Sequence, residues 1–236
     1  MARFLVIDHL DFSADPEEFA PVIALLIVVL TMLFSAISFG CCIMYAVRFY
    51  KNLFTDEGYI TWTLPASPLT QLWAKILSAS IWYVLDLTIC FAAAWFLISG
   101  DNIQSALERI KPDFQAALGM SFSSFCGLVV FFSFVGILSC VLFIYTSIAI
   151  GQLVPAHRII VSIAVYFILN LITQIISIGV SIITSVFPDY VFSPAQTSFS
   201  EYFFPMLLIG TCTTTVLAIA GYFITYRILQ RKVNLI

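Results

Sequence analysis

Residues 122–154 read FSSFCGLVVFFSFVGILSCVLFIYTSIAIGQLV, and no charged side chain interrupts them. A helix that crosses the hydrocarbon core of a bilayer needs about 20 apolar residues, and this stretch exceeds that length. It lacks the strict alternation of polar and apolar residues that a membrane β-strand shows. Because lipid offers no partners for backbone polar groups, the stretch predicts a transmembrane helix.

Four other stretches have the same character. They cover residues 21–47, 71–99, 159–187 and 203–228. Hydrophobic residues make up 61% of the chain and charged residues only 10%, whereas soluble domains carry about 25% charged residues. We therefore expect an all-α integral membrane protein, a bundle of about five transmembrane helices that forms one domain over residues 1–236.

The charges between these spans predict the orientation. If the chain crosses the membrane five times, seven of the ten basic residues share one side: Arg48, Lys51, Lys75, Arg158, Arg227, Arg231 and Lys232. Ten of the thirteen acidic residues fall on the other side, with the N-terminus. The positive-inside rule therefore predicts an external N-terminus, a cytoplasmic loop over residues 48–70 and a cytoplasmic C-terminus. The net charge of -3 argues against nucleic acid as a partner.

Motifs for catalysis are missing from the sequence. No GxxxxGK[ST] phosphate-binding loop, HExxH or GxSxG pattern occurs, and the two histidines, His9 and His157, are far apart. The six cysteines lie in apolar runs without metal-ligand spacing. We predict no catalytic residue, no metal site and no cofactor in this chain, so any energy must come from a partner or from an ion gradient.

The predicted loop contains the most distinctive stretch of the chain. Residues 48–68 read RFYKNLFTDEGYITWTLPASP. One interpretation is an amphipathic segment on the membrane surface, with Arg48 and Lys51 at anionic headgroups. The other is a short rigid helix, stopped by Gly58 and by the following prolines, that presents aromatic side chains and two carboxylates to a cytosolic partner.

Residues 48–82, RFYKNLFTDEGYITWTLPASPLTQLWAKILSASIW, resemble the cytoplasmic loop and following helix of small bacterial ABC exporter permeases of the type-two class. Firmicute members of that family read roughly RFYKNL-DEGYL-FTLPVS at this point. The resemblance implies a permease in the bacterial plasma membrane that forms the translocation path. It also implies a second permease chain, identical or a sister, and a cytosolic ATPase that binds ATP and Mg²⁺. The implied ATPase-coupling residues are Asp56, Glu57, Gly58, Tyr59, Leu64 and Pro65.

The family pattern has six spans, and the loop follows the second of them. Here the loop follows the first predicted span. We therefore expect that this chain lacks the family's first transmembrane helix or has a shortened N-terminus in its place, which agrees with the predicted external N-terminus.

Polar residues form a stripe along the fourth predicted span. At 100° per residue, a helix places Asn170, Gln174, Ser177 and Ser181 on one face, with Thr184 at its edge, opposite a row of isoleucines. The stripe indicates a face that avoids lipid. It either forms hydrogen bonds between helices or lines the translocation path.

Asp86 is the one acidic residue deep within a predicted span. A carboxylate in the bilayer is costly, so Asp86 should face the bundle interior or a water-filled cavity, where it could line the translocation path. There it either pairs with a hydroxyl or serves as a coupling-ion site. The second role would make the protein an ion-coupled secondary transporter. A membrane scaffold that transports nothing is a third hypothesis.

The predicted orientation can be tested by labelling in intact cells. A cysteine introduced at Asp15 should react with a membrane-impermeant maleimide, and one introduced at Asn234 should react only after the membrane is permeabilised. The reverse pattern would overturn the topology.

Overall fold

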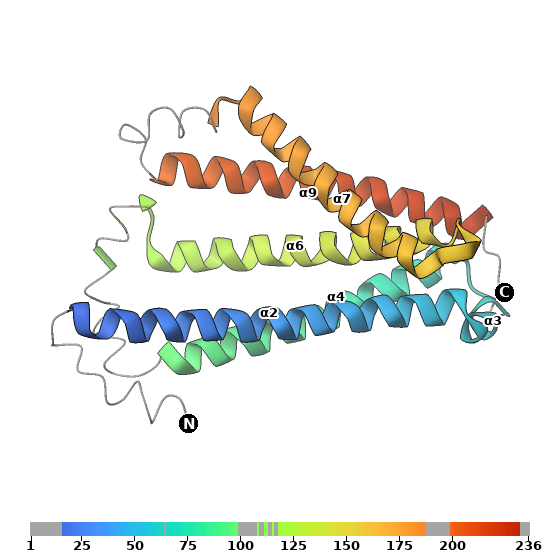
Figure 1. Ribbon diagram of the computed structural model, residues 1–236, viewed down its shortest axis with the longest axis horizontal. Helices are drawn as coiled ribbons and strands as arrows, with labels where there is room; N and C mark the ends of the chain where they lie inside the picture. The colour runs from blue at the N-terminus through green and yellow to red at the C-terminus, as the bar shows by residue number, and fades with distance from the viewer. Residues whose placement is uncertain are drawn as a thin grey trace. The chain divides into compact units, whose positions relative to one another are not determined.

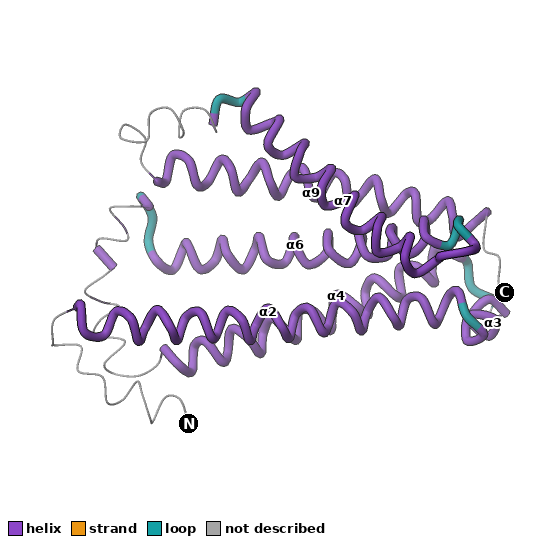
Figure 2. The backbone as a smooth tube through the Cα atoms, in the orientation of Figure 1, coloured by secondary structure: helices purple, strands orange, loops and turns teal. Residues whose placement is uncertain are grey.

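The computed structural model describes residues 16–63, 65–98, 108, 111, 112, 115, 118–186 and 199–231. In that part of the chain, the secondary structure is helical and no strand occurs (Figure 2). Among the described residues, five helices are long and apolar enough to cross a membrane, so the predicted all-α fold is confirmed. The orientation of the termini remains a prediction.

The five long helices follow the predicted spans closely (Figure 1). They are α2 (Pro16–Phe54), α4 (Pro68–Ile98), α6 (Phe122–Gly151), α7 (Arg158–Ile183) and α9 (Phe199–Arg231). Two short helices join them: α3 (Asp56–Thr63) connects α2 to α4, and the 3-10 helix η2 (Pro155–His157) connects α6 to α7. Large apolar side chains along the spans are exposed, including Trp95 at 71% and Ile183 at 83%. Such surfaces fit contact with lipid.

The connection predicted over residues 48–70 contains a short helix, α3, as one interpretation of its sequence expected, but α2 ends later than predicted. Helix α2 continues past Arg48 to Phe54 because no glycine or proline interrupts RFYKNLF and its apolar residues are covered. Phe49, Leu53 and Phe54 are 1%, 0% and 3% exposed. The polar residues that suggested a loop lie on the exposed side of the last turns of α2, whose other side is packed.

The chain divides into two compact units, and both contain parts of α2 and α4. One comprises Met1–Cys41 with Tyr83–Cys126, and the other comprises Cys42–Trp82 with Gly127–Ile236. In the first unit, Ser38 of α2 and Asp86 of α4 are hydrogen-bonded. The second unit holds α3, α7, α9 and most of α6, together with the adjoining halves of α2 and α4.

Small residues bring helices of the second unit into close contact. The Thr225 hydroxyl of α9 donates to the Thr146 hydroxyl of α6 at 3.1 Å, and both residues are at most 1% exposed. A Cβ on Gly221, one turn earlier in α9, would lie 2.6 Å from the Thr146 hydroxyl oxygen. Helices α7 and α9 also pack against each other (Figure 1). Small residues allow such close approach in membranes.

The junction of α6 with α7 depends on a glycine. A Cβ on Gly151 would overlap the Ser162 hydroxyl oxygen and lie 2.8 Å from the Arg158 carbonyl oxygen and 2.9 Å from the Ser162 nitrogen. Two of these atoms are backbone and cannot rotate away. Glycine is therefore the residue that lets the end of α6 lie against the first turn of α7.

Gly151→Ala should destabilise the protein by about 1–3 kcal/mol, since it forces the backbones of α6 and α7 apart. Thermal unfolding of the purified chain in detergent would measure the loss. Gly136→Ala is the matched control, because it lies in the same helix and an added Cβ meets nothing within 4 Å. That variant should be as stable as the parent or slightly more stable. Equal melting temperatures for the two variants would contradict the proposed role of Gly151.

Candidate functional site

The candidate site is the connection from α2 through α3 to α4. Helix α3 begins directly after α2 ends, and the Gly58 nitrogen donates to the Thr55 carbonyl oxygen at 2.7 Å. A Cβ on Gly58 would lie 2.8 Å from the backbone carbon of Leu53. The prediction that Gly58 stops a helix is therefore wrong. Gly58 lies within the first turn of α3 and allows this helix to turn back against the end of α2.

Side chains cap the two helix ends that meet here. The last carbonyls of a helix have no partner one turn further on, so they need donors from elsewhere. The Trp62 indole nitrogen donates to the Leu53 carbonyl oxygen at 3.0 Å, at the end of α2. The Gln71 side chain donates to the Thr61 carbonyl oxygen at 2.9 Å, in the last turn of α3. These two bonds join α3 to α2 and to α4.

Helix α4 begins with an N-terminal capping arrangement. The Ser67 hydroxyl accepts a hydrogen bond from the Thr70 backbone nitrogen at 3.2 Å. Pro68 is the first helical residue, where its fixed φ suits a helix and its missing N–H is not needed. The sequence Ser67-Pro68 therefore sets the point at which the connection ends and the span begins.

Asn52 links all three helices. With its amide oriented to suit its neighbours, Asn52 donates to Glu57 Oε2 at 3.1 Å and accepts from Lys75 Nζ at 2.8 Å. These residues lie on α2, α3 and α4 in that order. One carboxylate of α3 is therefore connected through an amide to a cation of the following span.

An aromatic pair extends this arrangement to α6. The rings of Phe49 and Tyr145 stack with centroids 3.8 Å apart and planes 10° from parallel. The Tyr145 hydroxyl donates to the Lys75 carbonyl oxygen at 3.1 Å, and the residue is 3% exposed. The end of α2 and the first turns of α4 are thus both held by one buried side chain of α6.

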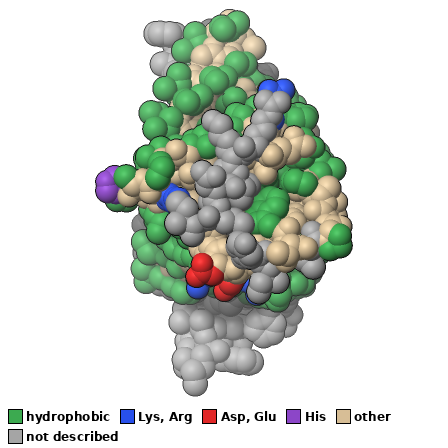
Figure 3. All heavy atoms as spheres, turned by 90° about the vertical axis from the view of Figure 1, so that its right-hand side faces the viewer, with side chains coloured by type: hydrophobic (Ala, Val, Ile, Leu, Met, Phe, Trp, Pro, Cys, Tyr) green, Lys and Arg blue, Asp and Glu red, His purple; other side chains and the backbone are tan. Residues whose placement is uncertain are grey.

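A pocket of about 350 Å³ opens beside these contacts. It is lined by residues of α2, α3, α4 and α6, all within the second unit: Tyr45, Arg48, Phe49, Lys51, Asn52, Glu57, Lys75, Ser78, Ala79, Trp82 and Tyr145. Figure 3 looks onto this end of the chain, where acidic and basic side chains lie next to apolar ones. The pocket therefore combines charge with aromatic surface.

The structure places the predicted coupling residues on or beside α3. Asp56 and Glu57 form its first turn, and both are exposed. Their charge suits the partial positive charge of a helix N-terminus. Gly58 is buried and Pro65 is exposed after the helix. Leu64 and the Tyr59 side chain lie outside the described residues.

The polar stripe of α7 divides between buried and exposed positions. Ser181 is 1% exposed, and the Ser177 hydroxyl oxygen would lie 3.8 Å from a Cβ placed on Gly210 of α9. Gln174 is exposed and Asn170 is half-buried. Ser181 and Asn170 donate to carbonyls one turn earlier in their own helix, at 2.9 and 2.8 Å. These donors are therefore satisfied within α7.

Asp86 belongs to the other compact unit. The Ser38 hydroxyl of α2 donates to Asp86 Oδ2 at 3.4 Å, and Asp86 is half-buried. This is the pairing with a hydroxyl that the sequence suggested as one alternative. The sequence could not name Ser38 as the partner, because that depends on how α2 and α4 align.

Sequence reasoning missed the pocket beside α3. It placed Arg48, Lys51 and Lys75 on one side of the membrane but did not bring them together with Tyr145. A signal was available in the spacing, since Lys75 and Trp82 are seven residues apart and therefore share one face of α4. No comparable pattern in the sequence indicated that Tyr145 of α6 would line the pocket.

Comparison with models of known protein families, with curated proteins and with solved structures finds no match for this chain. A functional assignment therefore depends on the site and on the resemblance of residues 48–82.

Trp62→Phe should loosen α3, because the smaller phenyl ring keeps an aromatic side chain but cannot donate the hydrogen bond to Leu53. A typical hydrogen bond contributes about 1 kcal/mol, so amide hydrogen exchange over residues 56–63 should become about fivefold faster. Trp73→Phe is the control, because Trp73 lies on α4 and packs elsewhere. The centroid of its ring is 5.8 Å from that of Tyr222. If both variants exchange alike over residues 56–63, Trp62 does not hold α3.

Proposed function

We propose that this chain is the permease subunit of an ABC exporter, and that α3 is the element that contacts a separate cytosolic ATPase. Five apolar helices are compatible with a membrane transporter subunit. The observation that carries the proposal is the construction of α3, whose last turn is hydrogen-bonded to both α2 and α4 and whose first turn carries the exposed Asp56 and Glu57.

Transmission of force supports a docking role for such an element. A short helix on a flexible loop would absorb the movement of a partner, whereas one bonded to α2 and α4 would pass that movement to both spans. The bonds from Trp62 to Leu53 and from Gln71 to Thr61 supply this attachment. An ATPase that changes shape on binding and hydrolysing ATP with Mg²⁺ would then move the ends of two helices together.

The charge of α3 favours a protein partner over a membrane surface. Anionic headgroups attract lysine and arginine, and repel a pair of carboxylates. Asp56 and Glu57 are exposed at the start of α3, on the side that the positive-inside rule predicts to be cytoplasmic. A cytosolic protein with a basic patch would complement them. A second permease chain completes the proposed unit, in the bacterial plasma membrane.

Ion-coupled transport at Asp86 is less well supported. The Ser38 hydroxyl already donates to this carboxylate, which offers a structural reason for an acid within a span. No comparable attachment links Asp86 to an element that could receive energy from a partner, among the residues described.

Asp56→Lys should release the ATPase or uncouple it, because it reverses an exposed charge and leaves the Glu57–Asn52 contact in place. Truncating an interface residue of this kind can cost about 2 kcal/mol, which corresponds to about thirtyfold weaker binding. The tagged permease would be purified from the membranes of the cells that naturally produce it, together with any Walker-motif ATPase bound to it. The retained ATPase and its rate of hydrolysis would then be measured in proteoliposomes.

Glu108→Lys is the matched control, with the same charge change at an exposed site on the predicted external side. It should keep both the ATPase and its activity. If Asp56→Lys behaves like this control, α3 is not the docking element. If no Walker-motif ATPase accompanies the unaltered chain, the exporter assignment is wrong.

A further inference from the structure

The pocket beside α3 has a composition that suits an amphipathic anion. Three of its lining residues are cations, Arg48, Lys51 and Lys75, and one is an acid, Glu57, which leaves a lining charge of +2. Asn52 already contacts both Glu57 and Lys75. Arg48 and Lys51 are therefore the charges that remain available to a ligand.

Arg48 and Lys51 stand three residues apart in the last turns of α2, so they share one face of the helix. Both are exposed. A guanidinium binds two phosphate oxygens at once, and an ammonium adds a point charge beside it. This pair is thus suited to a phosphate group.

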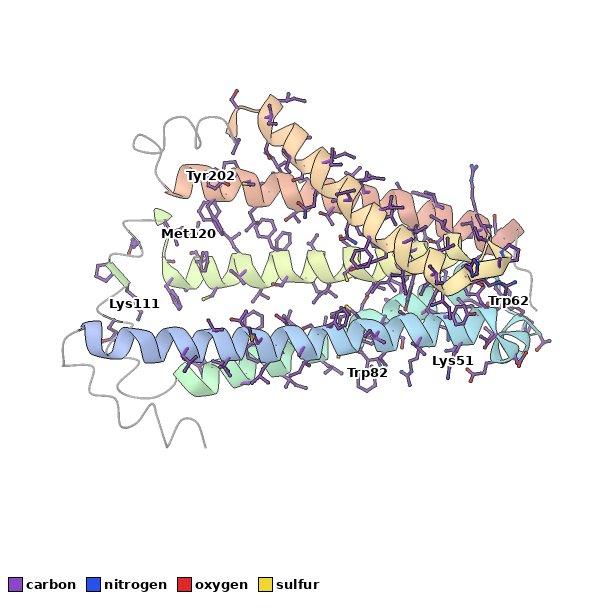
Figure 4. All side chains as sticks on the ribbon, in the orientation of Figure 1. Lys51, Trp62, Trp82, Lys111, Met120 and Tyr202 are labelled. Carbon is purple, nitrogen blue, oxygen red and sulfur yellow. The ribbon has the colours of Figure 1, made fainter. Side chains whose placement is uncertain are left out.

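Apart from Asn52 and Ser78, the remaining lining residues are aromatic or apolar. Phe49 and Tyr145 are 1% and 3% exposed and their rings are stacked, while Trp82 is 49% exposed. Lys51 and Trp82 lie along the same side of α2 and α4 in Figure 4. Tryptophan favours the level of lipid headgroups, where one part of the ring is apolar and the N–H is wet. A ligand for this pocket should therefore have an apolar part next to its phosphate.

The length of α2 places the pocket at a suitable depth. Its 39 residues extend for about 58 Å at 1.5 Å per residue, whereas the hydrocarbon core is about 30 Å thick. The end of α2 that carries Arg48 and Lys51 can thus reach the headgroup region. Basic pockets between transmembrane helices are known to bind anionic lipid headgroups.

We propose that this pocket binds one anionic phospholipid, with its phosphate between Arg48 and Lys51 and its glycerol region against Trp82. The site is more specific than attraction to a charged surface, because it fixes the phosphate beside an aromatic wall. The proposal does not depend on the exporter assignment, and its test uses the permease chain without any ATPase.

The experiment titrates the purified full-length chain in neutral detergent with phosphatidylglycerol, phosphatidylcholine or inorganic phosphate. Native mass spectrometry counts bound lipids, and quenching of tryptophan fluorescence by dibrominated phosphatidylglycerol gives the affinity. We expect saturation at one phosphatidylglycerol per chain and at least tenfold weaker binding of phosphatidylcholine. Trp82→Phe should remove most of the quenching while the lipid still binds.

Replacing both Arg48 and Lys51 with glutamine should weaken phosphatidylglycerol binding about thirtyfold. Replacing Lys111 and Arg227 with glutamine is the control, since it removes the same charge from two exposed sites outside the pocket. This control should bind as the parent does. If the first double variant does not fold, Lys51→Gln alone should weaken binding about fivefold, against Arg227→Gln as its control.

Three results would overturn the proposal. Equal affinity for the two lipids would remove the role of the anionic headgroup. Equal loss in both double variants would reduce the effect to general surface charge. Displacement of phosphatidylglycerol by an equal concentration of inorganic phosphate would make this a site for a free anion.

Discussion

The need to satisfy every polar group without water governs this structure. In lipid, an unpaired peptide group costs several kcal/mol, so the spans are continuous helices. The side chains obey the same constraint. Thr211, Thr214 and Thr215 of α9 donate to carbonyls one turn earlier at 2.7–2.8 Å, and Thr173 of α7 does the same. Hydroxyl groups on the spans are therefore compatible with either lipid or a neighbouring helix.

The same constraint explains where the chain can change direction. The last turn of a helix leaves carbonyl groups without hydrogen-bond partners. In the connection from α2 to α4, specific side chains donate to these groups. Trp62 and Gln71 cap the ends of α2 and α3, and Ser67 caps the start of α4. These bonds make the connection rigid as a direct result of satisfying its backbone. A docking element also needs to be rigid. The bonds that satisfy the backbone of this connection would therefore also suit it to bind a partner.

The parts that the sequence predicts well are those set by length and hydropathy. The five spans follow from uncharged stretches longer than about 20 residues, and their limits agree to within a few residues except at α2. The continuation of α2 to Phe54 was missed because Arg48, Lys51 and Asn52 resemble a loop in composition. Gly58 was taken as a helix stop, although its role is the close approach to Leu53. The contribution of α6 to the pocket could not be predicted, since Tyr145 and Lys75 are 70 residues apart and meet only through tertiary packing.

Asp56 and Glu57 show why adjacent residues of the same charge need different explanations. Glu57 is directed toward Asn52, which also holds Lys75, so this carboxylate is part of the framework that joins α2, α3 and α4. It also offsets one of the three cations of the pocket, leaving Arg48 and Lys51 for a phosphate. Asp56 precedes it by about 100° around the helix, and so projects in a different direction. A lipid bound on the Glu57 side and a protein bound on the Asp56 side would therefore contact α3 from separate directions. Because α3 is bonded to both spans, a change at either contact would reach the other through the same short helix.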